Sequence, residues 1–288
     1  MMGSPSEGAQ VDGGIGLRPR KGISAATSTG PWIPSSLLLA FLLVPVGALV
    51  FRALTGQDLP RSLGGAVVGQ ALGLSLVTSV SSALLTLFFG TPLAYLLARR
   101  HFRGRQLVDT LVDMPLVLPP VVAGVALLMA FGRMGVVGRY LDMAGLRLGF
   151  GAVAVVMAQT FVSAPLYVRA ARAGFASVDR RLESVSRTLG VTPFWTFIRV
   201  TLPLARPSLL AGLALAWARA LGEFGATMMF AGNLAGRTRT LPLAILTSME
   251  EDLDAALAIS LLLLAFSFLV LALLRTAGPR DDGLNATD

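Results

Sequence analysis

Residues 178–203 read VDRRLESVSRTLGVTPFWTFIRVTLP. This stretch lies between long apolar runs, yet it carries four arginines and two acidic residues. Asp179 suits a helix N-cap, and Gly190 suits the left-handed residue that commonly ends a helix. Pro193 follows a threonine, and the two fit the N-cap and first position of a second helix. The pattern predicts two short helices joined by a glycine turn, and we expect Pro203 to break the chain before the next span.

Both predicted helices have an apolar face. The apolar residues are Leu182, Val185 and Leu189 on the first helix, and Phe194, Phe197 and Ile198 on the second. Spacings of three and four residues place such side chains on one face of a helix. The residues alone leave two partners open. The helix pair either lies in the lipid headgroup layer, held by its arginines, or docks into another protein and transmits force to the spans.

The composition indicates a membrane protein. Of 288 residues, 54% are hydrophobic and 14% are charged, and the mean hydropathy is +0.72. The net charge of +8 comes from arginines between apolar runs, so we expect contact with anionic lipid rather than nucleic acid. The chain has no cysteine, and its one histidine, His101, lies in a polar loop. We therefore expect no catalytic residue, no bound metal and no cofactor in this chain.

Hydropathy predicts six membrane spans, since about 20 mostly apolar residues cross a bilayer. The spans are Ile33–Leu54, Ala66–Ala98, Leu111–Phe131, Gly149–Ala171, Ser208–Phe230 and Ala255–Leu274. We expect an all-α integral membrane protein, with one six-helix domain over 31–277. Residues 1–30, rich in Gly, Ser and Pro, are expected to be a disordered cytoplasmic tail, and 278–288 a cytoplasmic C-terminal tail.

Lysine and arginine counts predict the orientation of the spans. With the N-terminus inside, inner segments hold 16 of these residues and outer segments hold seven. Cytoplasmic loops carry such an excess, so both termini are expected to be cytoplasmic. Residues 178–203 then face the cytoplasm.

The stretch 178–203 resembles the cytoplasmic "EAA loop" of ABC importer permeases, with the pattern E-A-A-x3-G-x9-I-x-L-P. Gly190, Leu202 and Pro203 match this pattern, and Val200 stands at the isoleucine position. The start of the pattern departs, because Ser184, Val185 and Ser186 occupy the E-A-A positions and Glu183 lies one residue too early. The resemblance implies a MetI-like fold in which the loop couples to an ATP-binding subunit. The chain lacks a G-x-x-x-x-G-K-[ST] loop, so we expect ATP and magnesium on a separate chain, and no enzymatic activity here.

A charged pair lies in the fifth predicted span. Arg219 and Glu223 are four residues apart, so we expect them to share a helix face. Arg219 lies roughly 18 Å beyond Pro207 along the helix, near the bilayer centre, where charges are costly. The pair is either structural or part of a translocation path. The candidate path and gate residues are Arg219, Glu223, Gly225 and Thr227, and those of an outer mouth are Asn233, Arg237 and Arg239.

Residues 217–245, WARALGEFGATMMFAGNLAGRTRTLPLAI, resemble molybdate ABC permeases, and sulfate and thiosulfate permeases are similar. The resemblance implies a homodimer in the inner membrane with two ATP-binding subunits and an external oxyanion-binding protein. It implies import of molybdate, with tungstate or sulfate as alternatives. Two other classes remain, an ion-coupled transporter that uses Glu223 as its proton site and a membrane scaffold. An intramembrane serine protease is disfavoured because His101 lies outside the spans.

Two smaller features of the sequence, a proline cluster and a row of hydroxyl residues, each allow two interpretations. Prolines cluster in DMPLVLPPVVAG, residues 113–124, and predict either a hinge or a plain helix entry. Hydroxyl side chains follow the second span at Ser75, Thr78, Ser79, Ser81, Ser82 and Thr86. We expect these hydroxyls to make hydrogen bonds between helices and back to the helix backbone rather than to line a polar path.

Overall fold

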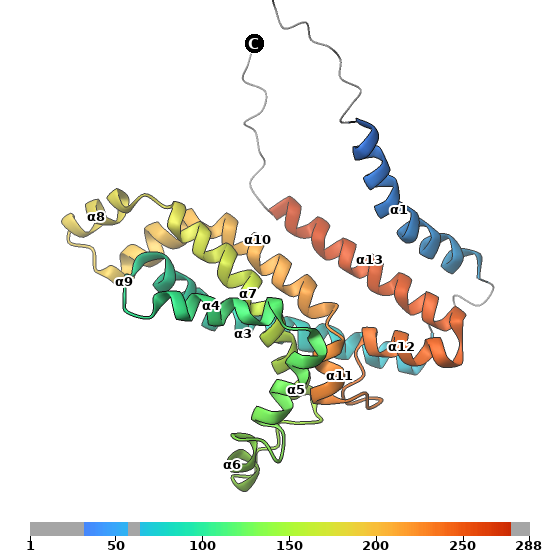
Figure 1. Ribbon diagram of the computed structural model, residues 1–288. Helices are drawn as coiled ribbons and strands as arrows, with labels where there is room; N and C mark the ends of the chain where they lie inside the picture. The colour runs from blue at the N-terminus through green and yellow to red at the C-terminus, as the bar shows by residue number, and fades with distance from the viewer. Residues whose placement is uncertain (1–31, 57–63, 278–288) are drawn as a thin grey trace, which may run out of the picture. The chain divides into compact units, whose positions relative to one another are not determined.

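The computed structural model describes residues 32–56 and 64–277, and in these ranges all regular structure is helical (Figure 1). The helices are α1 (Trp32–Thr55), α3 (Ala66–Arg99), α4 (Arg105–Val117), α5 (Pro120–Phe131), α6 (Gly138–Met143), α7 (Ala152–Ser177), α8 (Arg180–Thr188), α9 (Pro193–Thr196), the π-helix η1 (Phe197–Thr201), α10 (Leu202–Leu221), α11 (Gly225–Ala231), α12 (Leu241–Glu251) and α13 (Leu253–Ala277). The expected tails, 1–30 and 278–288, lie outside the described residues.

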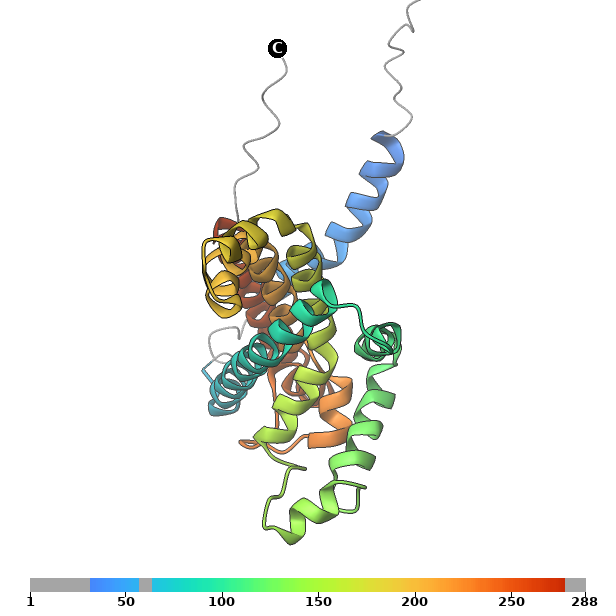
Figure 2. The same cartoon turned by 90° about the vertical axis from the view of Figure 1, so that its left-hand side faces the viewer.

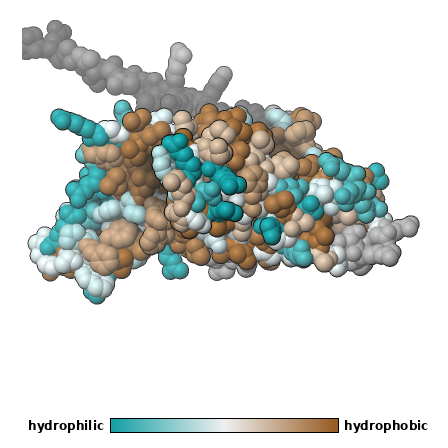
Figure 3. All heavy atoms as spheres, turned by 90° about the horizontal axis from the view of Figure 1, so that it is seen from below, coloured by the Kyte–Doolittle hydropathy of each residue, from teal (hydrophilic) through white to brown (hydrophobic). Residues whose placement is uncertain are grey.

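Five helical segments are long and apolar enough to span a membrane: α1, α3, α7, the continuous run Pro193–Leu221, and α13. A sixth span is available if α4 and α5 are counted together. Each of the six apolar runs of the sequence overlaps one of these segments. Hydrophobic side chains cover broad areas of the surface in Figure 3, as expected for a protein whose solvent is lipid.

The third predicted span is broken. The α4 and α5 axes differ by 118° in direction, and Figure 2 shows the sharp bend between these two green helices. Pro119 is the N-cap of α5 and Pro120 its first residue, so the break falls where two backbone N–H groups are missing. Pro120 begins a new helix, as a helix entry requires, whereas Pro115 lies inside α4. The expectation of a hinge stays a prediction.

The core of residues 48–277 is built by α3, α7 and α10. Tyr167 and Phe175 of α7 are fully buried in one apolar cluster with Leu97 of α3. Small residues let α7 and α10 approach closely, since a Cβ added at Gly212 would lie 2.6 Å from that of Ala170. Such contacts supply packing energy where lipid gives no hydrophobic driving force between helices.

Three of the six hydroxyl residues of α3 bond to other segments of the chain, whereas Thr78 and Ser81 bond back to the backbone of α3 itself. Trp217 Nε1 of α10 donates to Ser79 Oγ at 3.0 Å, and Thr160 Oγ1 of α7 donates to Ser82 Oγ at 3.0 Å. The backbone N–H at the start of α12 donates to Ser75 Oγ at 2.7 Å. The expectation of hydrogen bonds between helices is therefore confirmed for these hydroxyls.

The fifth predicted span, Ser208–Phe230, is wrong at both ends. The helix runs without interruption from Pro193, and the expected break at Pro203 does not occur. The π-helix η1 ends at Thr201, two residues before this proline, and the Leu202 N–H is bonded to the Phe197 carbonyl. A widened turn accommodates a residue that has no N–H and whose ring crowds the preceding turn. At the other end, α10 stops at Leu221 and a separate helix, α11, begins at Gly225.

Candidate functional site

The glycine turn between α8 and α9 is as predicted. The Asp179 carboxylate accepts from the Arg181 N–H at 2.9 Å and caps α8. Gly190 has a φ of +82°, and its N–H donates to the Arg187 carbonyl at 2.9 Å. A residue with a Cβ would be strained in this conformation. Pro193 begins α9, also as predicted.

The amphipathic helix α8 turns its polar face inward and its apolar face outward. Leu182, Val185 and Leu189 are 47%, 58% and 77% exposed, whereas Glu183 is only 6% exposed. On the second helix Phe194 is also exposed, whereas Phe197 is half-buried. The Phe197 ring packs inward on Tyr95 and Phe175, with centroids 4.9 and 5.9 Å away. The outer face of α8 is therefore available to a partner.

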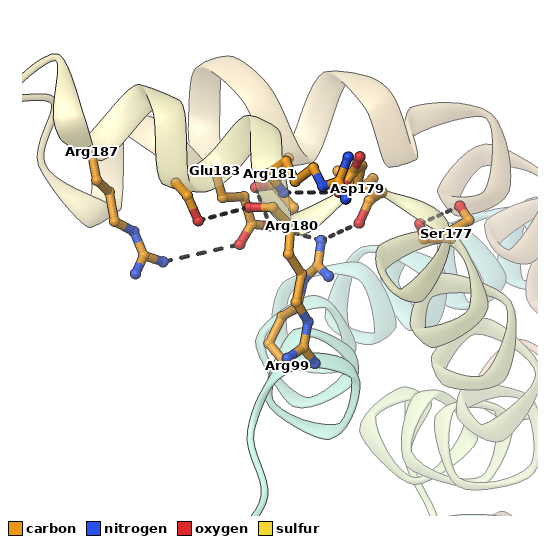
Figure 4. Close-up of polar contacts among 11 residues, drawn as sticks. Arg99, Ser177, Asp179, Arg180, Arg181, Glu183 and Arg187 are labelled. Carbon is orange, nitrogen blue, oxygen red and sulfur yellow. Dashed lines mark hydrogen bonds and ion pairs between the residues drawn. The ribbon is translucent and has the colours of Figure 1, made fainter.

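The buried Glu183 carboxylate connects three segments of the chain (Figure 4). Arg99 Nη2, at the end of α3, lies 2.8 Å from Glu183 Oε1, and both side chains are less than a tenth exposed. Thr201 Oγ1 of η1 donates to the same oxygen at 2.9 Å. Arg187 Nη2 is 4.0 Å from the other oxygen. Arg99 Nη2 also donates to the Val178 carbonyl at 2.9 Å, just before α8.

This network makes α8, η1 and the end of α3 one polar unit. Sequence reasoning missed Arg99, because it treated this residue only as one of the inner positive charges. The signal that could have found it is an arginine at the last residue of a long apolar helix, combined with a single acid on the polar face of α8.

The other predicted residues of the stretch 178–203 lie around this network. Ser186 Oγ and Thr196 Oγ1 are 3.1 Å apart and join α8 to α9. Ser184 is exposed and bonds back to the Arg180 carbonyl at 3.1 Å. The remaining positions are Val200 and Leu202, both half-buried, and Pro203, which is exposed. The structure therefore gathers the whole predicted stretch at one end of the helix bundle.

The Arg219–Glu223 pair forms, but not on one helix face. Arg219 Nη1 lies 2.6 Å from Glu223 Oε2, and Glu223 is 1% exposed. Glu223 lies beyond the end of α10, so the predicted shared helix face is wrong. Its Oε1 accepts from the Ala226 N–H at 2.9 Å, in the first turn of α11. A carboxylate at a helix N-terminus is favourable, which explains why a new helix begins here.

The two other predicted gate residues are buried in helix packing. A Cβ on Gly225 would lie 2.7 Å from the Cβ of Pro120, so α11 and α5 touch at backbone distance. Thr227 is fully buried, and its Oγ1 has no hydrogen-bond partner among the described residues. Both residues therefore lie at contacts within this chain.

The predicted outer-mouth residues lie in the loop between α11 and α12. The Asn233 amide donates to Thr247 Oγ1 at 2.9 Å and accepts from Arg239 Nε at 2.9 Å. These two residues therefore hold the loop together. Arg237 is exposed and makes no ion pair within the described part of the chain.

No group of three or more His, Cys, Asp or Glu side chains within 32–56 and 64–277 could hold a metal ion. The two arrangements described above are an exposed helix pair braced from behind by an ion pair, and a second ion pair between Arg219 of α10 and Glu223 just beyond that helix. Neither arrangement contains a nucleophile with an adjacent base.

A fold of this kind, with a braced helix pair before its penultimate span, defines a class of membrane transport subunits. Residues 90–280 match the family of binding-protein-dependent transport system inner membrane components, and the chain belongs to this family. ModB of Mycobacterium tuberculosis, a molybdenum transport system permease protein, is 44% identical over 242 residues, or 83% of this chain and 90% of that protein. NifC of Clostridium pasteurianum, a probable transport system permease protein, is 39% identical over 251 residues, or 86% and 87% of the two chains.

A solved structure gives the same fold. A chain from a bacterial ABC transporter that imports the acidic polysaccharide alginate superposes with a TM-score of 0.64. The match covers 85% of this chain and 93% of that one, at 18% identity. The expected ABC importer permease fold is therefore confirmed.

Proposed function

We propose that this chain is the permease subunit of an ATP-driven importer that carries molybdate. Its similarity to molybdenum permeases extends over most of both chains. The observation that carries the mechanism is the reversed amphipathic helix α8, with apolar side chains outside and a buried ion pair behind them. Such a helix needs an apolar socket, and a separate ATP-binding subunit supplies it.

The arrangement in the membrane follows from charge. Both termini and the pair α8–α9 lie in the cytoplasm, where positive residues are concentrated. Two copies of the chain line the path at their interface, and each docks one ATP-binding subunit that holds ATP and magnesium. An external binding protein delivers the oxyanion from the other side of the membrane.

Force enters through α8 and leaves through two contacts. When the ATP-binding subunits close, they move α8. The ion pair to Arg99 transfers this movement to α3, and the bond to Thr201 transfers it to the helix that continues as α10. Because both contacts are buried, the three segments move together, and the spans change from inward-open to outward-open.

An ion-coupled mechanism through Glu223 has less support. One oxygen of this carboxylate is bonded to a backbone N–H, and the other is paired with Arg219. A proton carrier would have to exchange both partners in each cycle. The pair instead stabilises the break between α10 and α11. Sulfate and thiosulfate import remain the alternatives for the substrate.

The test is transport into sealed vesicles that hold the permease and its ATP-binding subunit, with the binding protein outside. We expect molybdate uptake that requires both ATP and the ATP-binding subunit. Uptake that persists without the ATP-binding subunit would refute the mechanism. Competition by tungstate and by sulfate identifies the preferred anion, and uptake of sulfate alone would assign the chain to the alternative substrate class.

A further inference from the structure

A cavity of about 690 Å³ lies behind α8, between this helix, α9 and the end of α3. Its volume is within the range of small-molecule sites. One wall is cationic, with Arg100, Arg180 and Arg187, and another is apolar, with Leu96 and Phe194.

The charge of the cavity is strongly positive. Four arginines line it against one carboxylate, Glu183, which is already bonded to Arg99 and Thr201. Arg187 reaches Glu183 only at 4.0 Å. Arg100 and Arg180 form no ion pair among the residues that the structure describes. Guanidinium groups in this position favour an anion with several oxygens, such as a phosphate group.

The apolar wall of the cavity favours a phospholipid over a free inorganic anion. Leu96 lies one turn before the end of the spanning helix α3 and is 42% exposed, and Phe194 is 66% exposed. The apolar side of the cavity therefore continues into the surface that lipid covers. A free inorganic anion would use only the arginines, whereas a phospholipid would use both walls.

The helix α8 separates this cavity from the proposed docking face. Arg180, Glu183, Ser184 and Arg187 line the cavity, whereas Leu182, Val185 and Leu189 do not. The two sets lie on opposite faces of the helix, at 100° per residue. A partner bound to the apolar face therefore leaves the cavity open toward the membrane.

We propose that this cavity binds the phosphate of an anionic phospholipid, with an acyl chain along Leu96 of α3. The lipid lies beside the Arg99–Glu183 ion pair, where α8 meets α3. The anionic lipid content of the membrane then affects how firmly α8 is held. This site is independent of the transported substrate.

The experiment uses the full chain in nanodiscs of phosphatidylcholine that contain photo-crosslinkable phosphatidylglycerol, with mass spectrometry to map the labelled peptides. We expect labels near Leu96 and Phe194. The double variant Arg100→Gln, Arg180→Gln should lower this labelling about tenfold or more, since each arginine near a lipid surface contributes about 1 kcal/mol. Both residues are exposed, so gel filtration should show an intact protein.

The matched control is Arg103→Gln, Arg181→Gln, which removes two exposed arginines that do not line the cavity. We expect the lipid labelling of this control variant to stay within about twofold of that of the unchanged protein, because only the general attraction of positive charge to anionic lipid is reduced. Equal losses in the two double variants would overturn the proposal.

Two further arms identify the occupant. Inorganic phosphate should displace the label no better than sodium chloride of equal ionic strength, and a phosphate-specific loss would assign the site to a free anion. Labelling should also persist after the ATP-binding subunit is added. Its loss would show that a segment of that subunit fills the cavity, which would overturn the lipid assignment.

Discussion

The buried ion pair between Arg99 and Glu183 gives the sharpest prediction. Its side chains are 7% and 8% exposed, so neither charge is solvated if the other is removed. We expect Arg99→Met to lower the free energy of unfolding by about 3–5 kcal/mol, because it leaves a buried carboxylate unpaired. Arg187, at 4.0 Å, compensates in part and favours the lower end of this range. The double variant Arg99→Met, Glu183→Met should be more stable than either single variant, because no buried charge remains.

The assay is thermal unfolding of the full chain in detergent, followed by circular dichroism. A loss of 3–5 kcal/mol corresponds to a fall in Tm of roughly 6–20 °C for a chain of this size. The control is Arg133→Gln, because Arg133 pairs with Asp142 at 3.3 Å but is 73% exposed. This change should cost less than about 1 kcal/mol. If Arg99→Met unfolds at the temperature of the control, or if the double variant loses the sum of the two single effects, the reasoning about burial is wrong.

Three other predictions use glycines and the second ion pair. Gly190→Val should abolish the coupling of ATP hydrolysis to transport while the chain still inserts, because the φ of residue 190 is +82° and strains a β-branched residue. Gly190→Asn should retain most of the coupling, because asparagine tolerates this conformation. Uptake into vesicles per ATP hydrolysed distinguishes the two variants. Gly225→Leu should lower the free energy of unfolding by about 1–3 kcal/mol in the same thermal assay, because the new Cβ would meet Pro120. The control is Gly73→Ala, whose added Cβ would have no atom within 4 Å. This change should be neutral or stabilising. Glu223→Gln should reduce molybdate uptake strongly with little change in ATP-binding subunit capture, because it removes the charge of a buried carboxylate that joins Arg219 to the first turn of α11. Unchanged uptake would show that the pair is dispensable.

Local signals in the sequence were sufficient for the elements near residue 190. The cap at Asp179, the left-handed Gly190 and the first-turn Pro193 all depend on neighbours within a few residues, and all three are confirmed. The apolar spans were predicted as well, because their length and composition are set by the bilayer. Pro203 was misjudged, since a π turn accommodates it within a continuous helix, and nothing local in the sequence marks that turn.

The break after α10 shows why hydropathy alone fails. Residues 208–230 are apolar enough to form one span, yet the helix ends at Leu221. Glu223 bonds the first turn of α11, and Gly225 packs against Pro120 of a helix far away in the chain. The end of α10 therefore depends on contacts that appear only when α5 and α11 are packed together.

By itself, the sequence determined that this protein is a helical membrane protein with a glycine-linked helix pair before its penultimate span, because hydropathy and capping are local properties. Only the tertiary structure decided which way α8 faces. The pairing of Glu183 with Arg99 turns the polar side of the helix toward α3 and leaves its apolar side exposed. An unpaired carboxylate could not be buried there, so the position of one distant arginine sets the surface that a partner meets.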